Sequence, residues 1–175
     1  MKSRGTINAG AGCFAAFIFT ALMTTSATAD ISVRFDEGAP KDRFTFENVG
    51  SCPIGASELV LDISGSKAGL IFDTTGAGAG VEVYQPLEIV SGAQSLAAIT
   101  SVRDGDSEIT LSIADLQPGA KIAFTIDVDD TAGGREITVS GSEIEGALVT
   151  FSKKGRSATA ALSSGATALV KTGAC

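Results

Sequence analysis

The chain has 175 residues, with 13 Lys and Arg, 20 Asp and Glu, no His and no Trp. The absence of His excludes every mechanism that uses an imidazole as a base, a nucleophile or a metal ligand. A net charge of −7 argues against a nucleic-acid partner, because phosphates are bound by clustered Lys and Arg. One domain is expected at this length.

The first 29 residues have the features of a signal peptide. Lys2 and Arg4 precede an uncharged, apolar stretch over residues 7–23, and Ala27-Thr28-Ala29 supplies a small-x-small cleavage pattern. We therefore expect residues 1–29 to be removed and the mature domain to span residues 30–175. No later apolar stretch reaches the ~18 residues that cross a bilayer. The expected product is an acidic periplasmic or extracellular protein with no transmembrane anchor.

Two cysteines remain once Cys13 is removed with the signal peptide: Cys52 and Cys175. An even pair in an oxidising compartment is most simply interpreted as one internal disulfide. It would close a long loop and stabilise the fold by about 4–5 kcal/mol. The alternative is that Cys175, at the end of the chain, pairs with another chain and links two copies covalently.

The mature chain shows apolar residues at a period of two, which is typical of strands with one buried face. The alternating positions are Ile31, Val33 and Phe35; Phe44 and Phe46; Leu59, Leu61 and Ile63; Val81, Val83, Leu87 and Ile89; Ile109, Leu111 and Ile113; Ile122, Phe124, Ile126 and Val128; and Ile137 and Val139. Turn-forming residues separate these runs. The pattern predicts a single antiparallel β-sandwich, Ig-like or jelly-roll-like, with its clearest hairpin over residues 121–140. Residues 96–100 fit either a helical turn or a strand.

Few residues offer catalytic chemistry. Ser64-Gly65-Ser66-Lys67 and Lys171-Thr172-Gly173 match two elements of penicillin-recognising serine enzymes, but the middle element is missing. A pair of carboxylates that hydrolyses glycosides remains conceivable, although the chain is poor in aromatic residues that bind sugars. Five phenylalanines are instead expected in the core: Phe35, Phe44, Phe46, Phe72 and Phe124. We expect a protein that is not an enzyme.

The acidic residues suggest a cation site. Asp127 and Asp129 share the polar phase of a predicted strand, and Asp130 follows at its end. Ca²⁺ is bound by several carboxylate and carbonyl oxygens, which loops at strand ends can supply. The three aspartates are therefore the candidate ligands of Ca²⁺. The alternative is a solvated acidic turn, with Arg43 and Arg135 near enough in sequence to neutralise some of the acids.

Four segments resemble those of small exported bacterial proteins called aggregation factor core proteins, after the core protein of a calcium-dependent extracellular adhesion complex. They cover residues 33–44 (VRFDEGAPKDRF), 69–76 (GLIFDTTG), 80–86 (GVEVYQP) and 124–140 (FTIDVDDTAGGREITVS). The resemblance implies an extracellular β-sandwich in adhesion or self-association, with calcium as the ion. It implies no catalytic residue.

Three hypotheses follow, in order of preference. The first is a non-enzymatic exported protein of cell-surface adhesion or aggregation, with Ca²⁺ bound by Asp127, Asp129 and Asp130. The second is a module without metal that binds a surface glycan or a protein partner through loops such as residues 76–80. The third is a hydrolase that uses two carboxylates.

Overall fold

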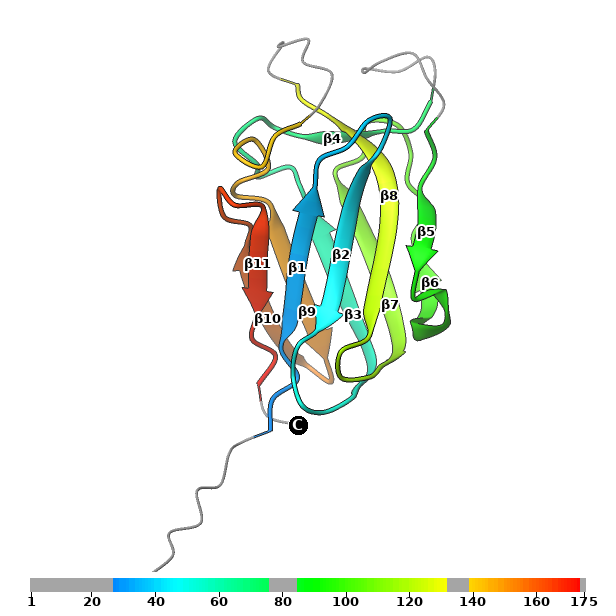
Figure 1. The fold of residues 1–175 in the computed structure, drawn as a ribbon, viewed down its shortest axis with the longest axis vertical. Helices are drawn as coiled ribbons and strands as arrows, with labels where there is room; N and C mark the ends of the chain where they lie inside the picture. The colour runs from blue at the N-terminus through cyan, green and yellow to red at the C-terminus, as the bar shows by residue number, and fades with distance from the viewer. Residues whose placement is uncertain (1–26, 76–84, 132–138, 174–175) are drawn as a thin grey trace, which may run out of the picture.

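The predicted all-β sandwich is confirmed by the structure, a computed structural model that describes residues 27–75, 85–131 and 139–173. Two antiparallel sheets pack face to face (Figure 1). Most of the predicted signal peptide lies outside the described residues, as does most of the return strand expected within the hairpin of residues 121–140. Of its two apolar residues, Val139 is described, and it is buried but not in a strand. Within the described ranges, no helix is long and apolar enough to cross a membrane.

The first sheet carries most of the aromatic core. Its strands, in spatial order, are β11 (Thr167–Val170), β1 (Ile31–Asp36), β2 (Asp42–Asn48), β8 (Lys121–Asp129) and β4 (Ile71–Asp73), and β5 (Glu88–Ser91) also pairs with β8. β8 is long enough to hold two short strands, β5 near its middle and β4 at its end. β4 therefore depends on β8 alone for strand pairing in the described part of the chain.

The second sheet has five strands. Their order is β10 (Arg156–Ala161), β9 (Leu148–Lys153), β3 (Ile54–Asp62), β7 (Glu108–Leu116) and β6 (Leu96–Ile99). A short 3₁₀ turn over Ala93–Ser95 leads into β6. Residues 96–100, for which the sequence allowed either a helical turn or a strand, thus contain a strand at a sheet edge.

The alternating residues fill the space between the sheets. All five phenylalanines expected in the core are buried there. Phe44 lies at their centre, with ring centroids 5.0 Å from Phe35, 5.3 Å from Phe124 and 6.5 Å from Phe72. Such ring pairs add packing energy beyond the apolar area that they bury. The rings therefore tie β1, β2, β4 and β8 together.

The sandwich has two ends of different charge. Asp42 begins β2 and pairs with Ile126, so the β1–β2 turn, β4 and the end of β8 share one end, the upper one in Figure 1. We call it the acidic end. The opposite end carries the β9–β10 turn with Lys153, Lys154 and Arg156. We call it the hairpin end.

The last residues of the predicted signal peptide pack against the domain at the hairpin end. Ala29 is buried, and its N–H donates to the carbonyl oxygen of Gly173 at 3.3 Å. The carbonyl oxygen of Thr28 accepts a hydrogen bond from the N–H of Ser51 at 2.7 Å. Cys52 follows Ser51, with its Sγ 3.4 Å from the same carbonyl oxygen. Cys175 lies outside the described residues, so its pairing with Cys52 stays a prediction.

Candidate cation site

Three carboxylates converge at the acidic end. Asp73, Asp127 and Asp129 each offer one oxygen, and these oxygens all lie within 4.8 Å of one another. We call these three residues the aspartate cluster. Two of its members, Asp127 and Asp129, are those that the sequence placed on one face of a strand. Asp130, the third residue predicted from the sequence, is not part of the cluster.

Strand register explains how the cluster forms. Asp127 and Asp129 are two residues apart on β8, so their side chains leave the same face of the sheet. β4 pairs antiparallel with this part of β8 and sets Asp73 directly opposite Asp127. Like charges in directly opposed positions destabilise a pair of strands. A cation or a proton at this point would remove that cost.

Asp73 is the most constrained member. Only 1% of its surface is exposed, and none of the described groups donates a hydrogen bond to its Oδ2. Its other oxygen accepts a long hydrogen bond, 3.4 Å, from the N–H of Thr75. A buried carboxylate oxygen without a donor is costly while the group is charged, since it has lost its hydrogen bonds to water. An oxygen in this state is suited to a metal ion.

Asp42 lies next to the cluster and has a structural task. Its Oδ1 accepts the N–H of Gly38 at 3.0 Å and its Oδ2 accepts the N–H of Val128 at 3.1 Å. The side chain therefore ties the β1–β2 turn to β8 beside Asp127. The pKa of Asp42 is raised to about 7, first by burial and then by the charges of Asp127 and Asp129. The two backbone hydrogen bonds lower it, but by less.

Burial also dominates the titration of the cluster itself. It raises the pKa of Asp127 to about 6, with a further rise from the charge of Asp129 and a reduction from Lys41. The pKa of Asp73 is raised first by burial and then by a hydrogen bond that its protonated form donates to Asp104. Carboxylates that hold their protons near neutral pH mark a site where negative charge lacks compensation.

Lys41, whose charge lowers the pKa of Asp127, is engaged elsewhere. Lys41 Nζ donates to the carbonyl oxygen of Pro86 at 2.9 Å and lies 3.0 Å from a carboxylate oxygen of Glu88. Of the two arginines proposed as partners of the acids, Arg43 makes no ion pair with any acid in the described ranges, and Arg135 lies outside them. Among the described residues, no arginine is thus found that neutralises the aspartate cluster.

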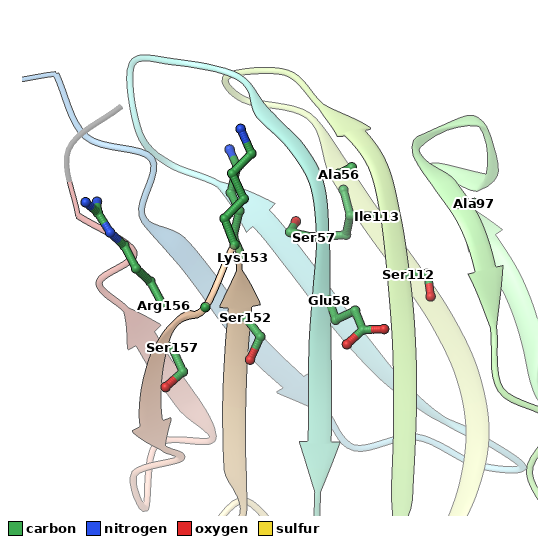
Figure 2. A pocket seen from close by; sticks show the side chains of 12 residues that line it. Ala56, Ser57, Glu58, Ala97, Ser112, Ile113, Ser152, Lys153, Arg156 and Ser157 are labelled. Atoms are coloured by element: carbon green, nitrogen blue, oxygen red, sulfur yellow. The ribbon is translucent and has the colours of Figure 1, made fainter.

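A second feature is a hollow on the outer face of the second sheet (Figure 2). Its floor consists of small and polar side chains from β3, β7 and β9, among them Glu58, Ser112 and Ser152. Lys153 and Arg156 extend past the strand ends at its rim. No aromatic side chain lines it, so the stacking surface on which sugar rings usually lie is missing.

No protein-family model, curated protein or solved structure matches the chain.

Proposed function

We propose that the protein is a non-enzymatic, exported β-sandwich that binds Ca²⁺ at the aspartate cluster and acts in cell-surface adhesion or aggregation. The observation that carries the proposal is the convergence of three carboxylates, one of them the buried Asp73, whose oxygens lie within 4.8 Å of one another. The resemblance to aggregation factor core proteins supports the adhesive role.

The geometry suits calcium. Ca²⁺ binds oxygens at about 2.3–2.6 Å, so two ligands on opposite sides of the ion lie about 5 Å apart. The oxygens of Asp73, Asp127 and Asp129 fall within that span. Calcium takes six to eight oxygens, and water completes the shell of an ion held at a partly open site. Three carboxylates supply more negative charge than one divalent ion requires, which favours a cation over a neutral ligand.

Thermal unfolding tests the proposal. The protein is heated in excess chelator and then in millimolar Ca²⁺, with Mg²⁺ as the control ion and light scattering recorded alongside. An ion at 100 times its Kd stabilises by about 2.7 kcal/mol, which moves the midpoint by several degrees. We expect a rise specific to Ca²⁺, with scattering that increases with the ion.

Paired variants locate the effect. Asp129→Asn removes a cluster carboxylate and should abolish the calcium shift. Asp115→Asn removes an exposed acid at the hairpin end of β7 and should leave the shift intact. An unchanged shift in Asp129→Asn would place the ion elsewhere.

A second candidate function is a module without metal that binds a glycan or a protein. The open hollow of Figure 2 favours it, because Glu58, Ser112 and Ser152 offer hydrogen bonds to a hydroxyl-rich ligand. Absence of any calcium shift, together with polymer binding that Glu58→Gln weakens, would favour this alternative.

A further inference from the structure

We propose that the β10 edge of the sandwich binds a second copy of this chain, forming a two-fold dimer in which the two β10 strands pair antiparallel. The surface differs from the aspartate cluster, and the dimer needs no cation. The proposal therefore goes beyond the function proposed above and can fail or stand independently of it.

The first argument is that this edge lacks the usual protection. β10 and β11 lie at the same edge of the sandwich, one in each sheet (Figure 1). Residues 157–170, which include nearly all of both strands, contain no charged residue and no proline. Natural sheets keep other strands from pairing with their edges by means of charges, prolines and bulges. An edge without any of them is a template for pairing.

The opposite edge shows what protection looks like in this protein. The register of β5 on β8 and that of β6 on β7 are both irregular. Glu88 begins β5, and Pro86 lies just before it. By contrast, β10 pairs with β9, and β11 with β1, through an unbroken register. Compared with β5 and β6, the β10–β11 edge is therefore the straighter template for a further strand.

Hairpin geometry identifies the groups that would pair. The two-residue turn of Lys154 and Gly155 has φ of 49° and 77°, as in a type I′ turn, and Arg156 pairs with Lys153 across it. In such a hairpin the pair beside the turn is hydrogen-bonded, and alternate residues then direct their N–H and C=O groups outward. These residues are Ser157, Thr159 and Ala161, and all three are exposed.

Symmetry then selects one register. A two-fold axis at Thr159 sets this residue opposite its own copy and Ser157 opposite Ala161 of the other chain, so that every outward-directed group finds a partner. Leu169 on β11 and Leu148 beside Ala161 are among the few large apolar residues that are exposed, at 46% and 40%. Both lie close to this edge, where a second copy would cover apolar surface.

Charge complementarity supports the antiparallel direction. Lys153, Lys154 and Arg156 form no ion pair with any acid in the described part of the chain. Antiparallel pairing brings this turn beside the acidic end of the other copy. There, Leu162 follows β10 and its carbonyl oxygen accepts the N–H of Gly146, next to Glu145. Glu145 pairs with Lys67 at 2.6 Å within its own chain, so the basic turn would join this pair. Parallel pairing would instead set the two basic turns side by side.

Sedimentation velocity over a concentration series tests the proposal, in chelator and again in Ca²⁺. We expect a reversible monomer–dimer equilibrium in both buffers, and non-reducing gels exclude dimers linked through Cys175. Thr159→Pro removes an outward N–H donor from each copy and should raise the dissociation constant about tenfold or more. Thr159→Lys sets two like charges opposite each other and should weaken the dimer without altering the backbone.

Ala97→Lys is the matched control, because it places the same charge on an exposed position of the opposite edge strand β6. It should leave the dissociation constant unchanged. Lys154→Glu combined with Arg156→Glu should weaken the dimer, most visibly at low salt. A chain that stays monomeric at every concentration would overturn the proposal, and so would a dimer that both Thr159 variants leave unaffected. A dimer without a calcium shift would refute the cation site alone.

Discussion

At the scale of single residues, the raised pKa values make stability depend on pH in an unusual direction. Asp42 and Asp127 titrate near pH 7 and 6 in the folded protein, and Asp73 is also raised. An unfolded aspartate titrates near 3.9, so the folded state binds more protons between about pH 4 and 7. The free energy of unfolding must then fall as pH rises through that range.

We expect the chelated protein to unfold at higher urea concentration at pH 5 than at pH 8. The difference should be on the order of a few kcal/mol, since one pKa unit corresponds to about 1.4 kcal/mol. Saturating Ca²⁺ should reduce this difference, because it stabilises the charged carboxylates at pH 8. Asp73→Asn keeps the shape of the side chain without its charge, and should also make stability less dependent on pH. Stability that rises from pH 5 to pH 8 in chelator would contradict the pKa shifts.

At the scale of elements, Thr28 and Ala29 pack against the domain, although both lie on the N-terminal side of the predicted cleavage site. Gly50 lies against them, and a Cβ at this position would come 2.1 Å from the carbonyl oxygen of Thr28. We expect Gly50→Ala to destabilise a chain that begins at Thr28 by about 1–3 kcal/mol, since overpacking forces the backbone to shift. In a chain that begins at Asp30, the same substitution should cost far less.

Urea unfolding is measured for the chain that begins at Thr28 and the chain that begins at Asp30, each with and without Gly50→Ala. The interaction energy between the truncation and the substitution then measures the contact directly. The shorter chain should itself be less stable, because it loses the hydrogen bonds from Ser51 N–H to Thr28 and from Ala29 N–H to Gly173. Equal effects of Gly50→Ala in both chains would show that residues 28 and 29 do not pack as described.

The strands that carry the site differ in how well the sequence predicts them. Alternation located the longer strands and placed Asp127 and Asp129 on one face, because side-chain direction in a strand is a local property. It missed Asp73, since β4 has only three residues and meets β8 through a register that depends on distant segments. The aspartate following Phe72 at the end of an apolar run was the available signal. Asp130 follows Asp129 directly in sequence, but it lies past the end of β8, where strand alternation no longer sets the direction of a side chain.

At the scale of the whole molecule, the aromatic core and the aspartate cluster are mechanically connected. Phe72 precedes Asp73 on β4, and its ring packs in a T-shaped arrangement with that of Phe44 in the core. Two backbone hydrogen bonds also hold β4, from Phe72 N–H to the carbonyl oxygen of Asp106 at 2.8 Å and from Gly105 N–H to that of Phe72 at 2.9 Å. The ring contact adds to them in holding Asp73 opposite Asp127. Phe151 is similarly buried but belongs to β9 in the other sheet. Loss of either ring should lower stability, but only one should disturb the site.

We therefore expect Phe44→Ala and Phe151→Ala each to lower the free energy of unfolding by about 3–5 kcal/mol. Phe44→Ala should also weaken Ca²⁺ binding, because β4 then samples positions in which the Asp73 carboxylate leaves the cluster. Phe151→Ala should bind Ca²⁺ as the unaltered chain does. Calorimetric titration at a low temperature, where circular dichroism shows both variants folded, separates the two effects. Equal affinities in the two variants would mean that the backbone pairing of β4 positions Asp73 without help from the ring contact.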